Sequence, residues 1–288
     1  MARDAWRIVF ISTVPPVVQS FVPLLRELGH EPVAVISARR RRPVPERPSI
    51  SDETVPAELD IHVPNHRRAV EPILRVHRPD LVITWGYPWR IPASALAIPR
   101  LGGINLHPAL LPRHRGPIPL AWAIRDGDAA FGVTWHRMDD RFDTGPILAQ
   151  ASVPILATDT SIGEVGPRLG AAAASLLPRV LERLAADDPG DAQSEEGATW
   201  AGFFEEDYAA VDWSESAEAI HRQVRAWQLA MGTGPVVGPV VELDGVRRRL
   251  TRTSLEEPAE GGRREVCGDG RPLWILETEP MDPPPQAA

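Results

Sequence analysis

The sequence predicts an α/β protein in which a mostly parallel sheet, packed by helices, is followed by a small β-rich domain. Two observations carry this prediction. Short apolar, β-rich runs alternate with helical patterns through the N-terminal half, and an acidic, turn-rich segment then marks a change in composition. With 288 residues and 43% hydrophobic content, the chain is long enough to build more than one core.

The first strand–helix–strand unit is expected at the N-terminal end. Residues 7–12 are apolar and β-rich and end in turn chemistry, which is typical of a buried parallel strand. Apolar residues recur at helical spacing over residues 17–28, and Gly29 follows as a stop signal. Residues 33–37 are again apolar, so the three segments together predict a βαβ unit.

The remaining elements follow the same logic. Further apolar runs predict strands at residues 81–85, 104–107, 132–138 and 147–155. The Ala- and Leu-rich residues 161–186 predict a long helix, which Pro178 should kink or split. A short helix is then expected at residues 216–227, with strands at 236–243, 247–253 and 273–278. Gly and Pro punctuation between these last strands suggests a small β-barrel or sandwich.

The change in composition sets the expected domain boundaries. Residues 187–197 are acidic and turn-rich, which indicates a linker between two differently patterned halves. We therefore expect a larger domain over residues 1–186, a linker at 187–204, a small β-rich domain over 205–280 and a disordered tail at 281–288.

Composition excludes several classes of protein. The net charge of −8 gives no whole-protein field that would attract nucleic acid, so any basic surface must be local. A single cysteine, Cys267, excludes an internal disulfide framework and a cysteine-based zinc site. The N-terminus lacks signal-peptide architecture, and no stretch approaches the roughly 20 apolar residues that span a bilayer. We expect no membrane partner and a cytoplasmic localisation.

Polar side chains occur where a predicted strand leaves the sheet. Asn105 and His107 are two residues apart, so an extended strand points both to one face. Ligands of open parallel sheets bind beyond the carboxyl ends of the strands. There an amide and an imidazole could converge on one carbonyl oxygen, the amide stabilising negative charge and the imidazole transferring a proton. Asp143 follows in a carboxylate-rich turn. Residue chemistry alone also allows a structural explanation. Asn105 and His107 could be polar residues with satisfied hydrogen bonds at a strand end, and Asp143 could cap the turn before Gly145.

The motifs around these residues resemble one known signature. The matching positions are Asn105-Leu106-His107, Leu110-Leu111-Pro112, Arg115-Gly116, Trp122-Ala123-Ile124, Gly132-Val133-Thr134 and Asp143-Thr144-Gly145. In these motifs and their spacing the chain resembles the 10-formyltetrahydrofolate-dependent formyltransferases, and a looser resemblance runs nearly end to end. The resemblance implies a Rossmann-like catalytic domain over residues 1–186, with helices on both faces of its sheet, and a small C-terminal barrel resembling an OB fold.

The resemblance also implies a mechanism. The acceptor amine attacks the formyl carbon directly, and Asn105 and His107 stabilise the resulting oxyanion. Asp143 orients His107 and manages the proton leaving the amine. No metal or nicotinamide is implied. The residues that the resemblance assigns to the donor, 10-formyltetrahydrofolate, are Gly86, Trp89, Arg90, Ile91, Pro92, Ala109, Leu110, Leu111, Pro112 and Asp140. A hydrolase that uses water in place of the amine would share the catalytic residues.

Two classes of acceptor remain open from the sequence, with Tyr87, Arg115 and His136 as the implied acceptor-binding residues. Methionyl-tRNA is one, because Arg39–Arg42 form a basic block that could contact phosphates. Three features favour a small amine or hydroxylamine instead: the Ser12–Pro16 turn, His136 in the strand before Asp143, and the acidic end of the last strand. The sequence therefore predicts a small-molecule acceptor, with methionyl-tRNA as the alternative.

Overall fold

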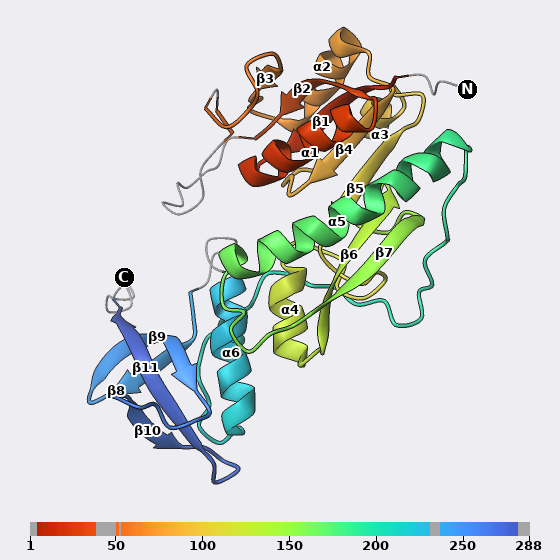
Figure 1. Cartoon of the computed structure of the whole chain (residues 1–288). Coiled ribbons are helices and arrows are strands. Elements are labelled where there is room, and N and C mark those ends of the chain that lie inside the picture. The colour runs from red at the N-terminus through yellow and green to blue at the C-terminus, as the bar shows by residue number, and fades with distance from the viewer. Residues whose placement is uncertain (1–4, 39–49, 52, 231–236, 282–288) are drawn as a thin grey trace. The chain divides into compact units, whose positions relative to one another are not determined.

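The computed structural model describes residues 5–38, 50–51, 53–230 and 237–281 (Figure 1). The chain divides into two compact units. The first unit comprises residues 1–116, 132–153 and 166–200, and the second comprises 117–131, 154–165 and 201–288. The Arg39–Arg42 block and nearly all of the expected tail lie outside the described residues.

A seven-stranded sheet organises the first unit. Its strands are β1 (Arg7–Ser12), β2 (Glu31–Ile36), β3 (Asp60–His62), β4 (Leu81–Trp85), β5 (Gly103–His107), β6 (Ala130–Arg137) and β7 (Ile147–Pro154), in the spatial order β3-β2-β1-β4-β5-β6-β7. The pairs β3–β2, β2–β1, β1–β4 and β4–β5 are parallel, whereas β5 and β6 are antiparallel. The predicted mostly parallel sheet is therefore confirmed.

The strand order explains where a ligand can approach. The chain builds β1, β2 and β3 outward in one direction and then returns to place β4 on the other side of β1. In a sheet of this kind, the loops that follow the two strands at the reversal, here β1 and β4, run in opposite directions from the carboxyl ends of the strands. A crevice forms between these loops. The ends of β4 and β5 lie beside this point, and β5 ends at His107.

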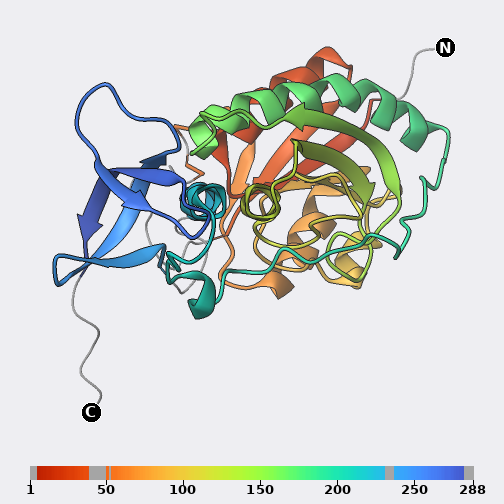
Figure 2. The same ribbon diagram turned by 90° about the horizontal axis from the view of Figure 1, so that it is seen from below.

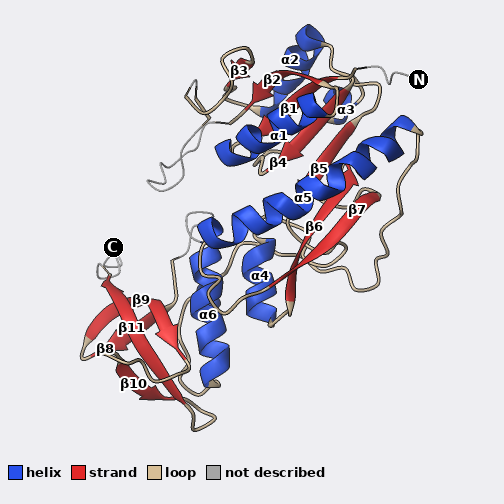
Figure 3. Ribbon diagram, viewed as in Figure 1, coloured by secondary structure: helices blue, strands red, loops and turns tan. Residues whose placement is uncertain are grey.

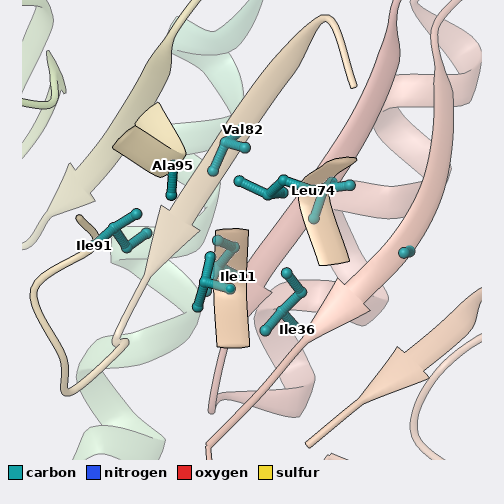
Figure 4. Close-up of a cluster of buried hydrophobic side chains, with 9 residues drawn as sticks. Ile11, Ile36, Leu74, Val82, Ile91 and Ala95 are labelled. Carbon is teal, nitrogen blue, oxygen red and sulfur yellow. The ribbon is translucent and has the colours of Figure 1, made fainter. Parts of the chain in front are cut away.

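Helices cover both faces of the sheet (Figure 2). On one face, α2 (Val70–His77) and α3 (Ala93–Leu96) pack on a buried apolar cluster (Figure 4) that includes Ile11, Ile36, Leu74 and Val82. The opposite face carries α1 (Pro15–Glu27) and α5 (Ile162–Ala185). There the Phe21 ring lies 5.8 Å from that of Trp135, whose indole N–H donates to the carbonyl of Ala173 at 3.0 Å. Alternate residues of each strand thus supply two apolar layers, and the predicted Rossmann-like architecture is confirmed.

The helix α5 is a single element of 24 residues with Pro167 and Pro178 inside it. Pro178 therefore does not split it, although a helix loses one hydrogen bond at each internal proline. Its buried face, which includes Leu169, Ala173, Leu177 and Val180, supplies the packing that holds it together. Within the described ranges, no helix combines the length and the apolarity that crossing a bilayer requires.

The second unit contains the expected small β-rich structure as a separate antiparallel sheet (Figure 3). Its strands β8 (Val240–Leu243), β9 (Val246–Ser254), β10 (Arg263–Val266) and β11 (Pro272–Pro280) are arranged β10-β11-β9-β8. The unit also holds α4 (Pro119–Asp126) and α6 (Ala217–Ala230). One apolar cluster joins Val224 of α6 to Leu250 and Ile275 of the sheet.

The contact pattern divides the chain differently from the expected boundary at residue 186. Residues 187–200 belong to the first unit. Asp191 exchanges two backbone hydrogen bonds of 2.8 Å with Ile147, and the Arg183 guanidinium binds the carboxylates of Asp188 and Asp191 at 2.7 and 2.9 Å. The acidic composition of residues 187–197 predicted a linker, but Asp188 and Asp191 of this segment bind Arg183 and Ile147 of the first unit.

Candidate active site

The structure brings Asn105, His107 and Asp143 together beyond the end of β5. Asn105 and His107 share one face of the strand, as the spacing of two predicts. The antiparallel neighbour β6 places His136 directly opposite Asn105 in register. The loop that follows β6 then turns back, with Asp143 in a left-handed conformation (φ 57°) that points its carboxylate at the other three side chains.

The Asp143 carboxylate is the centre of this cluster. One oxygen, Oδ1, accepts from Asn105 Nδ2 at 3.3 Å and lies 3.5 Å from His107 Nδ1 and 3.6 Å from His136 Nε2. The other, Oδ2, accepts the backbone N–H of Gly116 at 2.9 Å. Burial by itself would raise the pKa of Asp143, but the neighbouring His107 and His136 and the hydrogen bond from the Gly116 amide together lower it to about 2. Asp143 is therefore an anion at neutral pH.

The main chain around Asp143 is held from a distant part of the sequence. Gln193 donates its side-chain amide to the carbonyls of Asp143 at 2.9 Å and Gly145 at 2.8 Å. Gly145 packs so closely on the carbonyl of Arg137 that a Cβ would overlap it. The position of the carboxylate is thus fixed by contacts on both sides of the turn.

His107 lies between two hydrogen-bond acceptors. Its Nε2 is 2.8 Å from the carbonyl oxygen of His114, and its Nδ1 faces Asp143. A neutral imidazole carries one N–H and can donate to only one of them, whereas an imidazolium donates to both. Burial lowers the pKa of His107, and the Asp143 carboxylate opposes that shift. These opposed influences suit a group that takes up and releases a proton during a reaction.

The amide of Asn105 is oriented by Thr84, at the end of the adjacent strand β4. The Thr84 hydroxyl donates to Asn105 Oδ1 at 2.6 Å, so Nδ2 must point to the other side. There Nδ2 donates to His136 Nε2 at 3.1 Å and to Asp143. His136 Nδ1 lies 2.8 Å from the carbonyl oxygen of Arg137, which places its proton on Nδ1 and leaves Nε2 as an acceptor. Thr84 therefore fixes which end of the amide faces the cluster.

We expect Thr84→Val to lower the turnover number of the enzyme about tenfold while leaving the Michaelis constant for the donor nearly unchanged. Valine keeps the shape of threonine but removes the donor that distinguishes the oxygen and nitrogen of Asn105, so part of the population would present the wrong group. Thr84→Ser, which restores the hydroxyl, should recover most of the activity. Steady-state kinetics of both variants checks the role, and equal losses in the two variants would contradict it.

The loop after β5, which contains the predicted donor residues Ala109 to Pro112, is anchored to the neighbouring strands. The Thr134 hydroxyl donates to the carbonyl of Ala109 at 2.6 Å. Gln150 on β7 donates to the carbonyl of Leu111 at 3.0 Å and to the Thr134 hydroxyl at 2.7 Å. The backbone of this loop is therefore set by β6 and β7, as a loop that recognises a ligand through main-chain groups requires.

The other predicted donor segment lines a cavity of about 550 Å³. Its walls are Arg67, Pro88, Trp89, Arg90, Asp140, Arg141 and Phe142. Arg90 also donates to the main-chain carbonyl of Asp140 at 2.8 Å, which links the two loops that form the cavity. Gly86 has a positive φ of 65°, and Pro92 occupies the N-cap position of α3. Ile91 points into the apolar core under α2 and α3, so its side chain is structural.

The three predicted acceptor residues occupy different surroundings. His136 lies inside the cluster around Asp143 and is hydrogen-bonded to Asn105. Arg115 is buried, and its guanidinium binds Gln193 Oε1 at 3.0 Å and Glu195 at 3.2 Å. Tyr87 packs against the core beneath α2, with its ring 5.6 Å from that of Trp89; its hydroxyl is buried without a hydrogen-bond partner among the described residues. The acceptor roles of these residues stay predictions.

Sequence reasoning gave no role to four groups that complete the cluster: Thr84, Gly116, the carbonyl of His114, and Gln193. A polar residue at the end of strand β4 was a usable signal for Thr84, because neighbouring parallel strands end at one edge. Gln193 carried no such signal, since 50 residues separate it from Asp143 in the chain.

Comparison with known proteins gives consistent matches. Residues 6–181 match the family described as formyl transferase. A methionyl-tRNA formyltransferase of Ruegeria pomeroyi is 33% identical over 283 residues, covering 91% of this chain and 86% of the relative. A methionyl-tRNA formyltransferase of Ralstonia nicotianae is 38% identical over 185 residues, covering 64% of this chain and only 54% of that relative. The chain therefore spans about half the length of the Ralstonia protein.

Among solved structures, HypX from Aquifex aeolicus in complex with tetrahydrofolic acid has a TM-score of 0.68 to this chain. The two are 20% identical, and the match covers 97% of this chain and 45% of that one. At this identity the likeness shows a shared fold.

Proposed function

Because the chain belongs to the formyl transferase family, we propose that it transfers a formyl group from 10-formyltetrahydrofolate to the amine of methionyl-tRNA. The Asn105–His107–Asp143 cluster is the observation that supports formyl transfer. The identity of 33% to a protein named methionyl-tRNA formyltransferase, over 91% of this chain, supports the acceptor. The sequence alone favoured a small amine, and the comparison supports the alternative better.

The geometry of the cluster supports the mechanism that the family resemblance implies. The acceptor nitrogen attacks the formyl carbon, a C–N bond forms, and the carbonyl oxygen becomes an oxyanion. The 3.3 Å hydrogen bond from Asn105 to Asp143 is long, so this N–H can turn to the oxyanion as charge develops. His107, paired with the Asp143 anion, would stabilise the oxyanion when it takes up a proton. When the intermediate collapses, the bond to folate N10 breaks and N10 gains the proton that the amine loses.

The donor is proposed to lie along the two loops described above. The pterin would bind main-chain groups of residues 109–112, whose positions Thr134 and Gln150 set. The cavity lined by Trp89 and Arg90 would take the aryl and glutamyl part of the molecule. Its aromatic rings suit an aryl group, and Arg67 and Arg141 add positive charge for carboxylates.

A small amine is the second candidate, and His136 is the specific observation in its favour. The histidine bonds Asn105 directly and lies in a strand that resembles small-molecule members of the family. Its Nε2 accepts a hydrogen bond here, so it could also receive one from an acceptor amine. Both candidates use the same donor and the same oxyanion.

A turnover assay with 10-formyltetrahydrofolate separates the alternatives. We expect formylation of methionyl-tRNA at a rate that falls as salt rises, because phosphate contacts release counterions. Formylation of amino sugars or hydroxylated diamino acids without formylation of tRNA would move the assignment to the second candidate. Formate release that is independent of any acceptor would indicate a hydrolase.

Donor binding is tested separately by thermal unfolding. Tetrahydrofolate at a hundredfold excess over its dissociation constant should stabilise the protein by about 2.7 kcal/mol. An unchanged melting temperature at saturating folate would contradict the assignment of a folate donor.

The predicted cytoplasmic localisation agrees with such substrates and stays a prediction.

A further inference from the structure

A second cluster of ligating side chains lies at the edge of the sheet. Asp60 and His62 are two residues apart on β3, and His77 is the last residue of α2. One ligand atom from each lies within 4.8 Å of the others, the one such group of three or more among the described residues. His62 Nε2 is 2.8 Å from His77 Nε2, and the latter is 3.9 Å from Asp60 Oδ2.

The facing nitrogens of His62 and His77 define what this cluster can hold. Two imidazole nitrogens in contact are compatible only when one carries a proton and the other a lone pair. A divalent cation between them accepts both lone pairs at once and adds the carboxylate of Asp60 as a third ligand. We propose that Asp60, His62 and His77 bind a transition-metal ion of the zinc type, with water completing its coordination.

The distances require only small side-chain movements. Zinc–nitrogen bonds of about 2.0–2.1 Å at tetrahedral angles place two nitrogens roughly 3.3 Å apart. The imidazoles must therefore separate by about 0.5 Å, and the Asp60 oxygen must move closer by a similar amount. The Asp60 side chain is 74% exposed and free to turn, while His77 is buried and forms the fixed side of the site.

The ligand set and the local charges determine which metal is bound. Imidazole nitrogens favour zinc, nickel and copper, whereas magnesium and calcium favour oxygen ligands. The Arg7 guanidinium lies nearby and donates to the carbonyl of His77 at 3.1 Å, but Glu31 lies 3.4 Å from the same guanidinium. Asp60 supplies the negative charge that the bound ion needs.

The expected effect is structural. β3 is three residues long and, among the described strands, pairs with β2 alone, at the edge of the sheet. A metal bound by two residues of β3 and one of α2 would tie this short strand to the helix. The site is separate from the Asn105–His107–Asp143 cluster, so this inference does not depend on the proposed function.

The test uses the full-length protein, freed of metal with EDTA and titrated with Zn²⁺ by calorimetry. We expect one equivalent to bind and to raise the melting temperature, and Co²⁺ to give visible absorption bands of low coordination number. His62→Ala should weaken binding at least about a hundredfold, because even partners outside the ligand shell contribute about ten- to hundredfold. Asp60→Asn should weaken it about tenfold or more.

His66→Ala is the matched control, since His66 is exposed nearby in sequence and outside the cluster. Its affinity for Zn²⁺ should equal that of the wild type. Absence of Zn²⁺ binding by the wild type, or equal affinity in His62→Ala and His66→Ala, would overturn the proposal. Asp60→Asn, at an exposed position, keeps the test decisive if His62→Ala fails to fold.

Discussion

Asn105→Ala, His107→Ala and Asp143→Ala are each expected to lower the turnover number by at least about 10²-fold while donor affinity stays nearly constant. Loss of one oxyanion donor costs on the order of 10² to 10³ in turnover, and loss of a general acid or base about 10² to 10⁴. We propose that the three side chains act mainly in the transition state, where the formyl oxygen carries charge. Interactions made only there change the rate and leave ground-state binding unaffected.

Single-turnover kinetics and folate titration measure the two quantities separately. The double variant His107→Ala with Asp143→Ala should be little slower than the slower single variant, because a coupled acid–base pair is non-additive. Asn65→Ala and His66→Ala are matched controls at exposed positions and should keep wild-type turnover. Near-normal turnover in a folded His107→Ala protein would show that the chemistry occurs elsewhere.

Gly132→Ala should weaken donor binding about tenfold or more, which corresponds to roughly 1.4 kcal/mol, and lower the free energy of unfolding by about 1–3 kcal/mol. A Cβ at this position in β6 would lie 2.6 Å from the Ala109 carbonyl carbon, with the Leu110 nitrogen closer still. Both are backbone atoms and cannot move away alone. The methyl group would therefore displace the loop over residues 109–112.

Gly170→Ala is the matched control for this substitution. Its Cβ would meet no atom within 4 Å, and the residue lies inside α5. Alanine should stabilise that helix by about 0.5–1 kcal/mol. Chemical unfolding and folate titration of the two variants therefore have opposite expected signs, and normal folate affinity in Gly132→Ala would show that the loop does not bind the donor.

The sheet could be predicted because most of its strands are buried, and a buried strand appears in the sequence as a short run of apolar residues. β1 begins and ends where expected, and the other predicted strands differ by a few residues at their ends. β3 and α2 were missed for a physical reason. β3 has three residues, none fully buried, and α2 has eight residues, with charged or polar side chains at three of them. Elements this short take their structure from neighbours.

The residues that the structure brings into the candidate site could be predicted only in part from chemistry. Asn105 and His107 are visible from their spacing in one strand, whereas Asp143 depended on a family resemblance. Thr84 and Gln193 reach the cluster through the fold, across 21 and 50 residues of sequence. Residue spacing along the sequence does not indicate contacts between segments that only the fold brings together.

The side-chain amide of Gln193 also bears on which fragments of the chain can work alone. A fragment that ends at residue 186, where composition places the boundary, would keep Asn105, His107 and Asp143. It would nevertheless lose both hydrogen bonds that hold the backbone of the Asp143 turn. A carboxylate on an unsupported turn samples many orientations, and misplacement by an ångström can cost about 10²-fold in rate. We therefore expect the smallest active fragment to extend at least through Gln193.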